Sequence, residues 1–372
     1  MIKFICTFIA FLLLSSFLYG QHNTEKIETL ISQEKIQEAR ILIDKALLED
    51  ANNPKLLLYK GMIIQNQIEI STPSQDKKYI LDSVYYFYSQ ALKYDTHQYL
   101  SPILSEQLQT VAQQYSYAGM EQFNEGEYKS ALSIFEKNIK ILQLPIIGQL
   151  DTMMLYNAAF SAEKLKDYPK ERYYYQEILK YRPNDWESII ELANTYKNEG
   201  NSNQYFSIIK KANQKHPEVA TFYNQLIGYY LENKKSDSAL IYLDVLINKE
   251  KFNDKLQYLR GSILQEQGKI AESEQAYKRS LKLNPNNLDA AYNLAANNYN
   301  KAVDLLEKKK LSKKEKTNLK LYLTISLSYL ETVRKQEPQN KYVLSMLMTC
   351  YQELNMKKEE KELKIYIEDN QK

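Results

Sequence analysis

Three prolines in the second half of the chain follow a fixed spacing. Pro183 and Pro217 are 34 residues apart, and Pro285 lies two further periods of 34 residues along the chain. Small or apolar residues keep the same period, namely Ala159, Ala193, Ile227, Gly261 and Ala295. Such a period indicates repeated supersecondary units that bury their apolar faces against their neighbours. The chain is therefore not expected to form one globular domain around a central core.

Each period reads as two helices. When the proline is numbered 32, positions 4, 7, 8 and 11 of one repeat hold Leu155, Ala158, Ala159 and Ala162. Spacings of three and four place these residues on one face of a first helix. Position 8 should be small because the second helix crosses closely there, and Ile227 is the exception. Positions 20, 24 and 27 form the packing face of the second helix. They hold Ala131, Phe135 and Asn138 in the repeat that starts at Ala112, and Ala239, Leu243 and Leu246 in a later one.

The pattern Arg260-Gly261, Ala276-Tyr277 and Leu283-Asn284-Pro285 resembles the tetratricopeptide repeat. Residues 112–338 resemble an array of such repeats, residues 21–111 a more divergent set, and residues 339–372 a closing helical pair. The resemblance implies an all-α, right-handed superhelical solenoid of about nine helix–turn–helix repeats.

One repeat is longer than the others. Pro285 and Pro338 are 53 residues apart, which leaves 19 extra residues near 299–320. We expect a helix that continues to Leu311, a turn, and a returning helix at 322–335. The phrase from Tyr292 to Val303 resembles a closing unit of exported repeat proteins from Bacteroidetes-type bacteria.

The first twenty residues resemble a secretory signal peptide. Lys3 precedes an apolar run from Phe4 to Leu18, and Gly20 offers a small residue for cleavage. The alternative is an uncleaved anchor. We expect an exported protein, periplasmic or associated with the outer envelope, with no integral membrane span once residues 1–20 are removed. Cys350 would then be the only cysteine, and its apolar surroundings indicate a buried, inert thiol.

The composition argues against several functions. The chain has 49 basic and 46 acidic residues, a balance that does not favour a nucleic-acid partner. His22, His97 and His216 have no metal-binding spacing, and neither a phosphate-binding loop nor a nucleophile elbow is present. We therefore expect no enzymatic activity, metal or cofactor.

The resemblance implies that positions 2, 5, 9, 12 and 13 of the first helices line a concave binding groove. Tyrosine and asparagine suit such a groove, since they offer apolar rings, hydroxyls and amides to a peptide. The candidate binding residues are Tyr156, Asn194, Asn224, Tyr258, Tyr292 and Asn300. None of them occupies a packing position of the register. We expect a protein or peptide partner; capture of a glycan or small ligand through the tyrosine-rich groove is the alternative.

Overall fold

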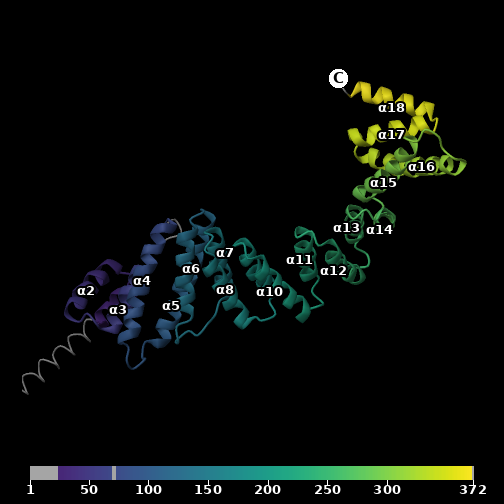
Figure 1. Cartoon of the computed structure of the whole chain (residues 1–372). Coiled ribbons are helices and arrows are strands. Elements are labelled where there is room, and N and C mark those ends of the chain that lie inside the picture. Colours follow the sequence, from purple (N-terminus) through teal and green to yellow (C-terminus); the bar gives the residue numbers. More distant parts are fainter. Residues whose placement is uncertain (1–23, 69–72, 371–372) are drawn as a thin grey trace, which may run out of the picture. The chain divides into compact units, whose positions relative to one another are not determined.

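The computed structural model describes residues 24–68 and 73–370, and every regular element in these ranges is a helix (Figure 1). The helices form nine consecutive pairs. The pairs are 24–32 with α2 (Ile36–Glu49), α3 (Pro54–Gln65) with α4 (Ser74–Tyr94), α5 (Ser101–Asn124) with α6 (Tyr128–Leu142), α7 (Thr152–Lys164) with α8 (Tyr168–Tyr181), α9 (Trp186–Asn198) with α10 (Ser202–Lys215), α11 (Ala220–Glu232) with α12 (Ser236–Lys249), α13 (Asp254–Glu266) with α14 (Ile270–Leu283), α15 (Leu288–Leu306) with α16 (Lys313–Gln336), and α17 (Lys341–Glu353) with α18 (Lys357–Asp369). The predicted all-α repeat fold is confirmed. The predicted signal peptide, residues 1–20, lies outside the described residues.

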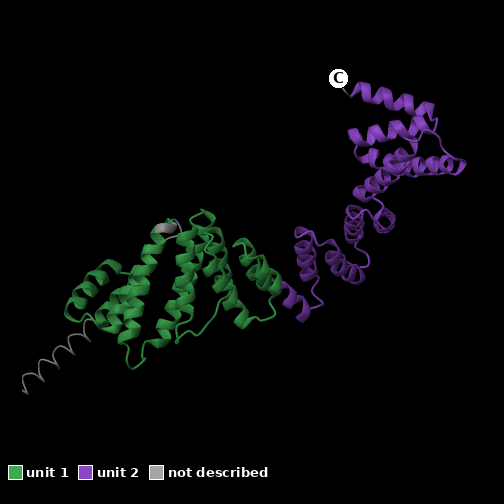
Figure 2. Ribbon diagram, viewed as in Figure 1, with its two compact units in different colours: residues 1–208 green, residues 209–372 purple. Residues whose placement is uncertain are grey.

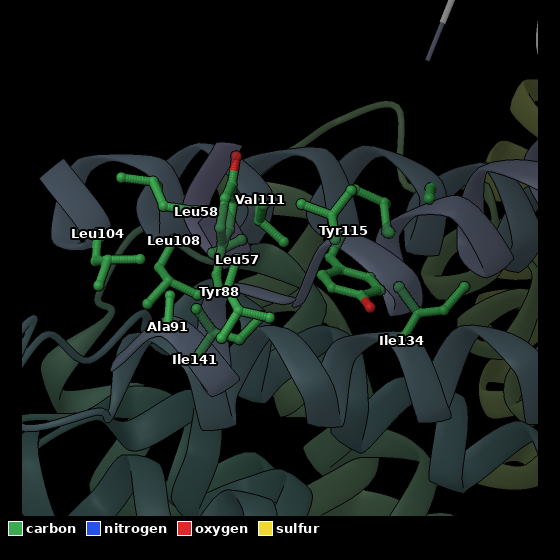
Figure 3. Packing of buried hydrophobic residues seen from close by; sticks show 14 residues of the cluster. Leu57, Leu58, Tyr88, Ala91, Leu104, Leu108, Val111, Tyr115, Ile134 and Ile141 are labelled. Carbon is green, nitrogen blue, oxygen red and sulfur yellow. The ribbon is translucent and has the colours of Figure 1, made fainter. Parts of the chain in front are cut away.

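The chain divides into two compact units, residues 1–208 and residues 209–372, which we call unit 1 and unit 2 (Figure 2). The largest buried cluster of unit 1 is formed by α3, α4, α5 and α6. Figure 3 shows the rings of Tyr88 and Tyr115 among leucine, valine and isoleucine side chains of this cluster. Their hydroxyls donate to Gln65 Oε1 and Asp82 Oδ1 at 2.6 Å each. Each ring is thus buried while its polar atom keeps a partner, as a buried tyrosine requires.

The close crossing expected at position 8 is present in both units. In unit 2, a Cβ atom placed on Gly261 of α13 would lie 2.5 Å from Cε1 of Tyr277 in α14. In unit 1, a Cβ on Gly119 of α5 would lie 2.5 Å from Cε1 of Phe135 in α6. Both rings are fully buried. Glycine at position 8 therefore lies against an aromatic ring at position 24 in these two repeats. In the repeat of α7 and α8 the corresponding pair is Ala159 and Tyr175, which are both buried in one cluster.

Ile227 does not break this rule, because the side chain opposite it is smaller. Sixteen residues after Ile227 the chain has Leu243, and both are buried in the same cluster of α11 and α12. A branched aliphatic side chain at position 8 is thus matched by a leucine instead of a ring. The side chains at positions 8 and 24 fill the same space between the two helices of a repeat, so a larger residue at one position requires a smaller one at the other.

The long repeat differs in detail from the expectation. The helix predicted to continue to Leu311 ends at Leu306, and the returning helix begins at Lys313, well before Tyr322. The reason is a capping box: Ser312 Oγ accepts from the Glu315 backbone N–H, while the Glu315 carboxylate accepts from the Ser312 backbone N–H. The extra residues therefore lengthen both helices of the pair.

Candidate functional site

The six predicted binding residues all lie on first helices, but they fall in both units. Tyr156 (α7) and Asn194 (α9) belong to unit 1. The other four belong to unit 2, namely Asn224 (α11), Tyr258 (α13), and Tyr292 and Asn300 (α15). Asn224 and Asn300 are exposed, and Asn194 is half-buried with its Nδ2 donating to Glu191 Oε2 at 3.3 Å. These three amides stay predicted binding residues.

Tyr156 has a packing role that the register did not assign to it. Its ring is half-buried and meets the Tyr175 ring edge-on at 6.2 Å between centroids. Its hydroxyl donates to Asp185 Oδ2 at 2.5 Å and lies 2.6 Å from Ser188 Oγ. Burial, followed by the bond to Asp185, raises the pKa of Tyr156 to about 12. The expectation that Tyr156 occupies no packing position is wrong, because its side chain links α7 to the beginning of α9. Its role in binding stays a prediction.

The two predicted tyrosines of unit 2 also pack. The Tyr258 ring lies 5.8 Å from the Tyr277 ring, and its hydroxyl accepts a long, 3.5 Å contact from Asn293 Nδ2. Tyr292 is half-buried against the cluster of α15, α16 and α17. Both side chains therefore contribute to packing, contrary to the expectation that neither occupies a packing position. Their role in binding stays a prediction.

Glu171 of α8 is the buried carboxyl nearest to this region of unit 1. It is 2% exposed, and its Oε1 accepts from Thr195 Oγ1 at 2.7 Å. Burial raises the pKa of the Glu171 carboxyl to about 7; the bond from Thr195 opposes this, and the nearby carboxylates of Glu163 and Glu191 add to it. A perturbed carboxyl can mark an active site. Here it lies between packed helices and lines no cavity described below, so we assign it to the fold.

Unit 1 exposes large apolar side chains on the first helices α5 and α7. Tyr117 and Met153 are 64% and 61% exposed, and Met120 and Phe160 are each 39% exposed. We call these four residues the apolar row. Asn157 Nδ2 of α7 lies 3.4 Å from Met120 Sδ of α5, so the two helices that carry the row are in direct contact. Exposed apolar side chains gathered on neighbouring helices indicate an interaction surface.

A cavity of about 670 Å³ adjoins the apolar row in unit 1, and we call it the polar cavity. Its walls come from α5, α6 and the connection to α7. The lining residues are mostly amides, hydroxyls and carboxylates: Glu106, Gln109, Thr110, Ala112, Gln113, Ser116, Asn138, Leu142, Gln149, Leu150, Asp151 and Thr152. No lysine or arginine is among these described lining residues, so the charge of the cavity is negative.

Sequence reasoning found only part of this surface. The register places Met153 and Phe160 at groove positions 2 and 9, but the candidate binding residues do not include them. Tyr117, Met120 and most of the polar cavity lie before the predicted groove, which begins at Tyr156. One signal was available: polar residues recur at spacings of three and four from Glu106 through Gln109, Thr110 and Gln113 to Ser116. Such spacing marks one face of a helix.

Neither a metal site nor a membrane span is formed by residues 24–68 and 73–370. No group of three His, Cys, Asp or Glu side chains in these ranges could hold a metal ion. None of the helices there combines the length and the apolar composition of a membrane span. Cys350 is buried, and burial raises the pKa of its thiol to about 11, which keeps it protonated and unreactive at neutral pH.

The paired helices and the polar and apolar surface on their first members define an all-α repeat protein. Residues 191–297 match the family model of the tetratricopeptide repeat-like domain. This part of the chain is thus similar to a tetratricopeptide repeat-like domain, in agreement with the 34-residue period.

Solved structures similar to this chain include three tetratricopeptide-type proteins. The MamA protein is 17% identical over 51% of this chain and 95% of its own, with a TM-score of 0.38. A thermophilic TPR protein of Thermus thermophilus is 20% identical over 50% of this chain and 98% of its own, with a TM-score of 0.31. The C-terminal part of a TPR repeat-containing protein from Cytophaga hutchinsonii is 14% identical over 63% of this chain and 99% of its own, with a TM-score of 0.41. No curated protein matches the chain.

Proposed function

We propose that this chain is a non-enzymatic scaffold that binds an extended peptide segment of a protein partner along the apolar row. The observation that carries the proposal is the exposure of Tyr117, Met120, Met153 and Phe160 on two first helices in contact with each other. The described residues of unit 2 offer no such row, since only one of the large apolar side chains exposed there, Tyr342 of α17, lies on a first helix.

The partner should carry apolar side chains at alternate or helical spacing. Tyrosine, methionine and phenylalanine are enriched at the centres of interfaces, where they supply most of the binding energy. The half-exposed carboxylate of Glu163 lies three residues after Phe160 on α7, and none of the salt bridges among the described residues involves it. A partner segment that combines apolar and basic residues therefore suits unit 1.

Export to the periplasm or outer envelope is part of the proposal. It is supported by the charge and apolar pattern of residues 1–20. Capture of a glycan or small ligand through the tyrosine-rich groove is less well supported, because the rings of Tyr156, Tyr258 and Tyr292 pack against neighbouring side chains.

The proposal is tested by selecting peptides from a phage-displayed random dodecapeptide library on the immobilised full chain. Affinities of the selected peptides are then measured by fluorescence anisotropy. We expect Met153→Ala with Phe160→Ala to weaken binding by about tenfold or more, since each truncation removes an interface side chain worth ~1 kcal/mol or more. Failure of the wild-type chain to enrich any peptide would refute the proposal.

The matched control lies on the second helix α12 of unit 2. Ile241 and Val245 are 65% and 39% exposed, and these fractions match those of Met153 and Phe160. The double variant Ile241→Ala, Val245→Ala therefore removes a similar exposed apolar area. This control should bind like the wild type. Equal losses in both double variants would show that the selected peptides bind apolar surface without preference for the row.

A further inference from the structure

The polar cavity results from two departures from the repeat. The helix α5 has 24 residues, whereas α3, α7 and α9 have 12 or 13. The connection from α6 to α7 covers residues 143–151 instead of the short turn found between most repeats. Its path is held in place, because Ser105 Oγ donates to the Ile146 carbonyl at 3.1 Å and the Gln149 N–H to the Leu142 carbonyl at 2.9 Å. The extra turns of α5 and this connection form fixed walls.

Asn138 of α6 lines the polar cavity and is only 2% exposed. Its Nδ2 donates to the Ala112 carbonyl at 2.5 Å, which fixes the orientation of the amide, and its Oδ1 has no partner among the described residues. The same register position holds the apolar Ile178 and Leu246 in two other repeats. In a third it holds Ser280, whose hydroxyl accepts from Asn287 Nδ2 at 3.1 Å. A buried acceptor left without a donor is costly, so an asparagine here points to a ligand that supplies an N–H or O–H group.

The remaining lining defines the chemistry of that ligand. The amides of Gln109, Gln113 and Gln149 can donate to and accept from a peptide backbone. The carboxylates of Glu106 and Asp151 provide negative charge that no lining cation neutralises. Together they suit a backbone that carries a guanidinium or ammonium group.

The polar cavity and the apolar row are continuous along both helices. On α5, Gln113 and Ser116 line the cavity, and Tyr117 and Met120 follow on the same helix face at spacings of three and four. On α7, Thr152 lines the cavity and the exposed Met153 follows directly. One extended segment can therefore occupy both.

We propose that the polar cavity binds a lysine- or arginine-containing stretch of the same peptide whose apolar stretch lies on the apolar row. This inference rests on the proposed function and adds the chemical identity and direction of the segment. The basic residues lie toward Glu106 and Asp151, and the apolar residues toward Met120 and Phe160.

The test compares peptide selections on the full-length wild type and on the Glu106→Gln, Asp151→Asn double variant. Asparagine keeps an oxygen that can accept from the Met153 N–H, as Asp151 does at 2.8 Å, so the beginning of α7 is preserved. Wild-type selections should yield peptides with basic residues at one end and apolar residues at the other. Selections on the variant should lose the basic residues and keep the apolar ones.

A matched control has the same change of charge in unit 2. Asp289 and Glu353 are exposed carboxylates, so Asp289→Asn with Glu353→Gln shifts the net charge equally. For a wild-type-selected peptide, the cavity variant should weaken binding by about tenfold, whereas the control should leave it unchanged. An equal loss in both variants, or basic residues that persist in selections on the cavity variant, would overturn the inference while peptide binding itself stands. Failure of the wild type to select any peptide would instead refute the proposed function.

Discussion

The packing between Gly261 and Tyr277 predicts a large effect from one added methyl group. In Gly261→Ala, the new Cβ would lie 2.5 Å and 2.6 Å from two ring carbons of Tyr277. The ring cannot easily move, since it is fully buried and its hydroxyl donates to Gln265 Oε1 at 3.1 Å. Overpacking costs about 1–3 kcal/mol, and the better helix propensity of alanine returns up to about 1 kcal/mol. With about 1 kcal/mol gained from helix propensity, the net loss of stability should be about 0–2 kcal/mol.

Two further variants separate this clash from the general effect of removing a glycine. Gly228 of α11 has no atom within 4 Å of an added Cβ, so Gly228→Ala should stabilise by about 0.5–1 kcal/mol. Adding Tyr277→Leu to Gly261→Ala should recover part of the loss, because Leu243 already accommodates a larger residue at the equivalent position, Ile227. The double variant should therefore cost less than the sum of the single ones.

The assay is urea unfolding followed by far-ultraviolet circular dichroism, with hydrogen exchange to localise the change. Since repeats couple mainly to their neighbours, faster exchange should concentrate in α13 and α14. If Gly261→Ala and Gly228→Ala change the stability equally, the close approach does not limit the residue at position 8.

The remaining predictions concern single side chains. The pKa of Glu171 is raised from 4.5 to about 7, so the folded state binds this proton more tightly than the unfolded state does. The free energy of unfolding should therefore fall as the pH rises from about 4.5 to 7. In unfolding measured across that range, Glu171→Gln should make this fall smaller by roughly 2–3 kcal/mol. Tyr156→Phe should cost about 1 kcal/mol in thermal unfolding, as it removes the bond to Asp185, while Tyr181→Phe at an exposed ring should change nothing. Cys350 should resist thiol reagents in the native protein and react at once in denaturant; rapid native labelling would contradict its burial.

The repeat architecture could be predicted because the packing residues recur at regular spacings within each 34-residue period. The predicted first-helix face of Leu155, Ala158, Ala159 and Ala162 is entirely buried. The exception Ile227 could also have been anticipated, since Leu243 stands at the position where other repeats carry a ring. Both features depend on residues of a single repeat.

The candidate site was harder to predict because it depends on departures from the period. The residues at 101–111 extend α5 with helical spacing but lie outside the 34-residue register, and the connection at 143–151 is longer than the turns between most repeats. The role of Tyr156 depends on where the next helix begins, since its hydroxyl meets Asp185 and Ser188 at the first turn of α9. Tertiary contacts of this kind cannot be read from the register of one repeat.

The contact between Tyr156 and the beginning of α9 lies next to a tryptophan that can serve as an intrinsic fluorescence probe. Trp186, the only tryptophan of the chain, follows Asp185 directly and is 41% exposed. Its emission should therefore respond to changes in the hydration of this turn and to little else in the molecule. Occupancy of α7 and opening of the contact at Asp185 could both be followed by intrinsic fluorescence, without attaching a dye.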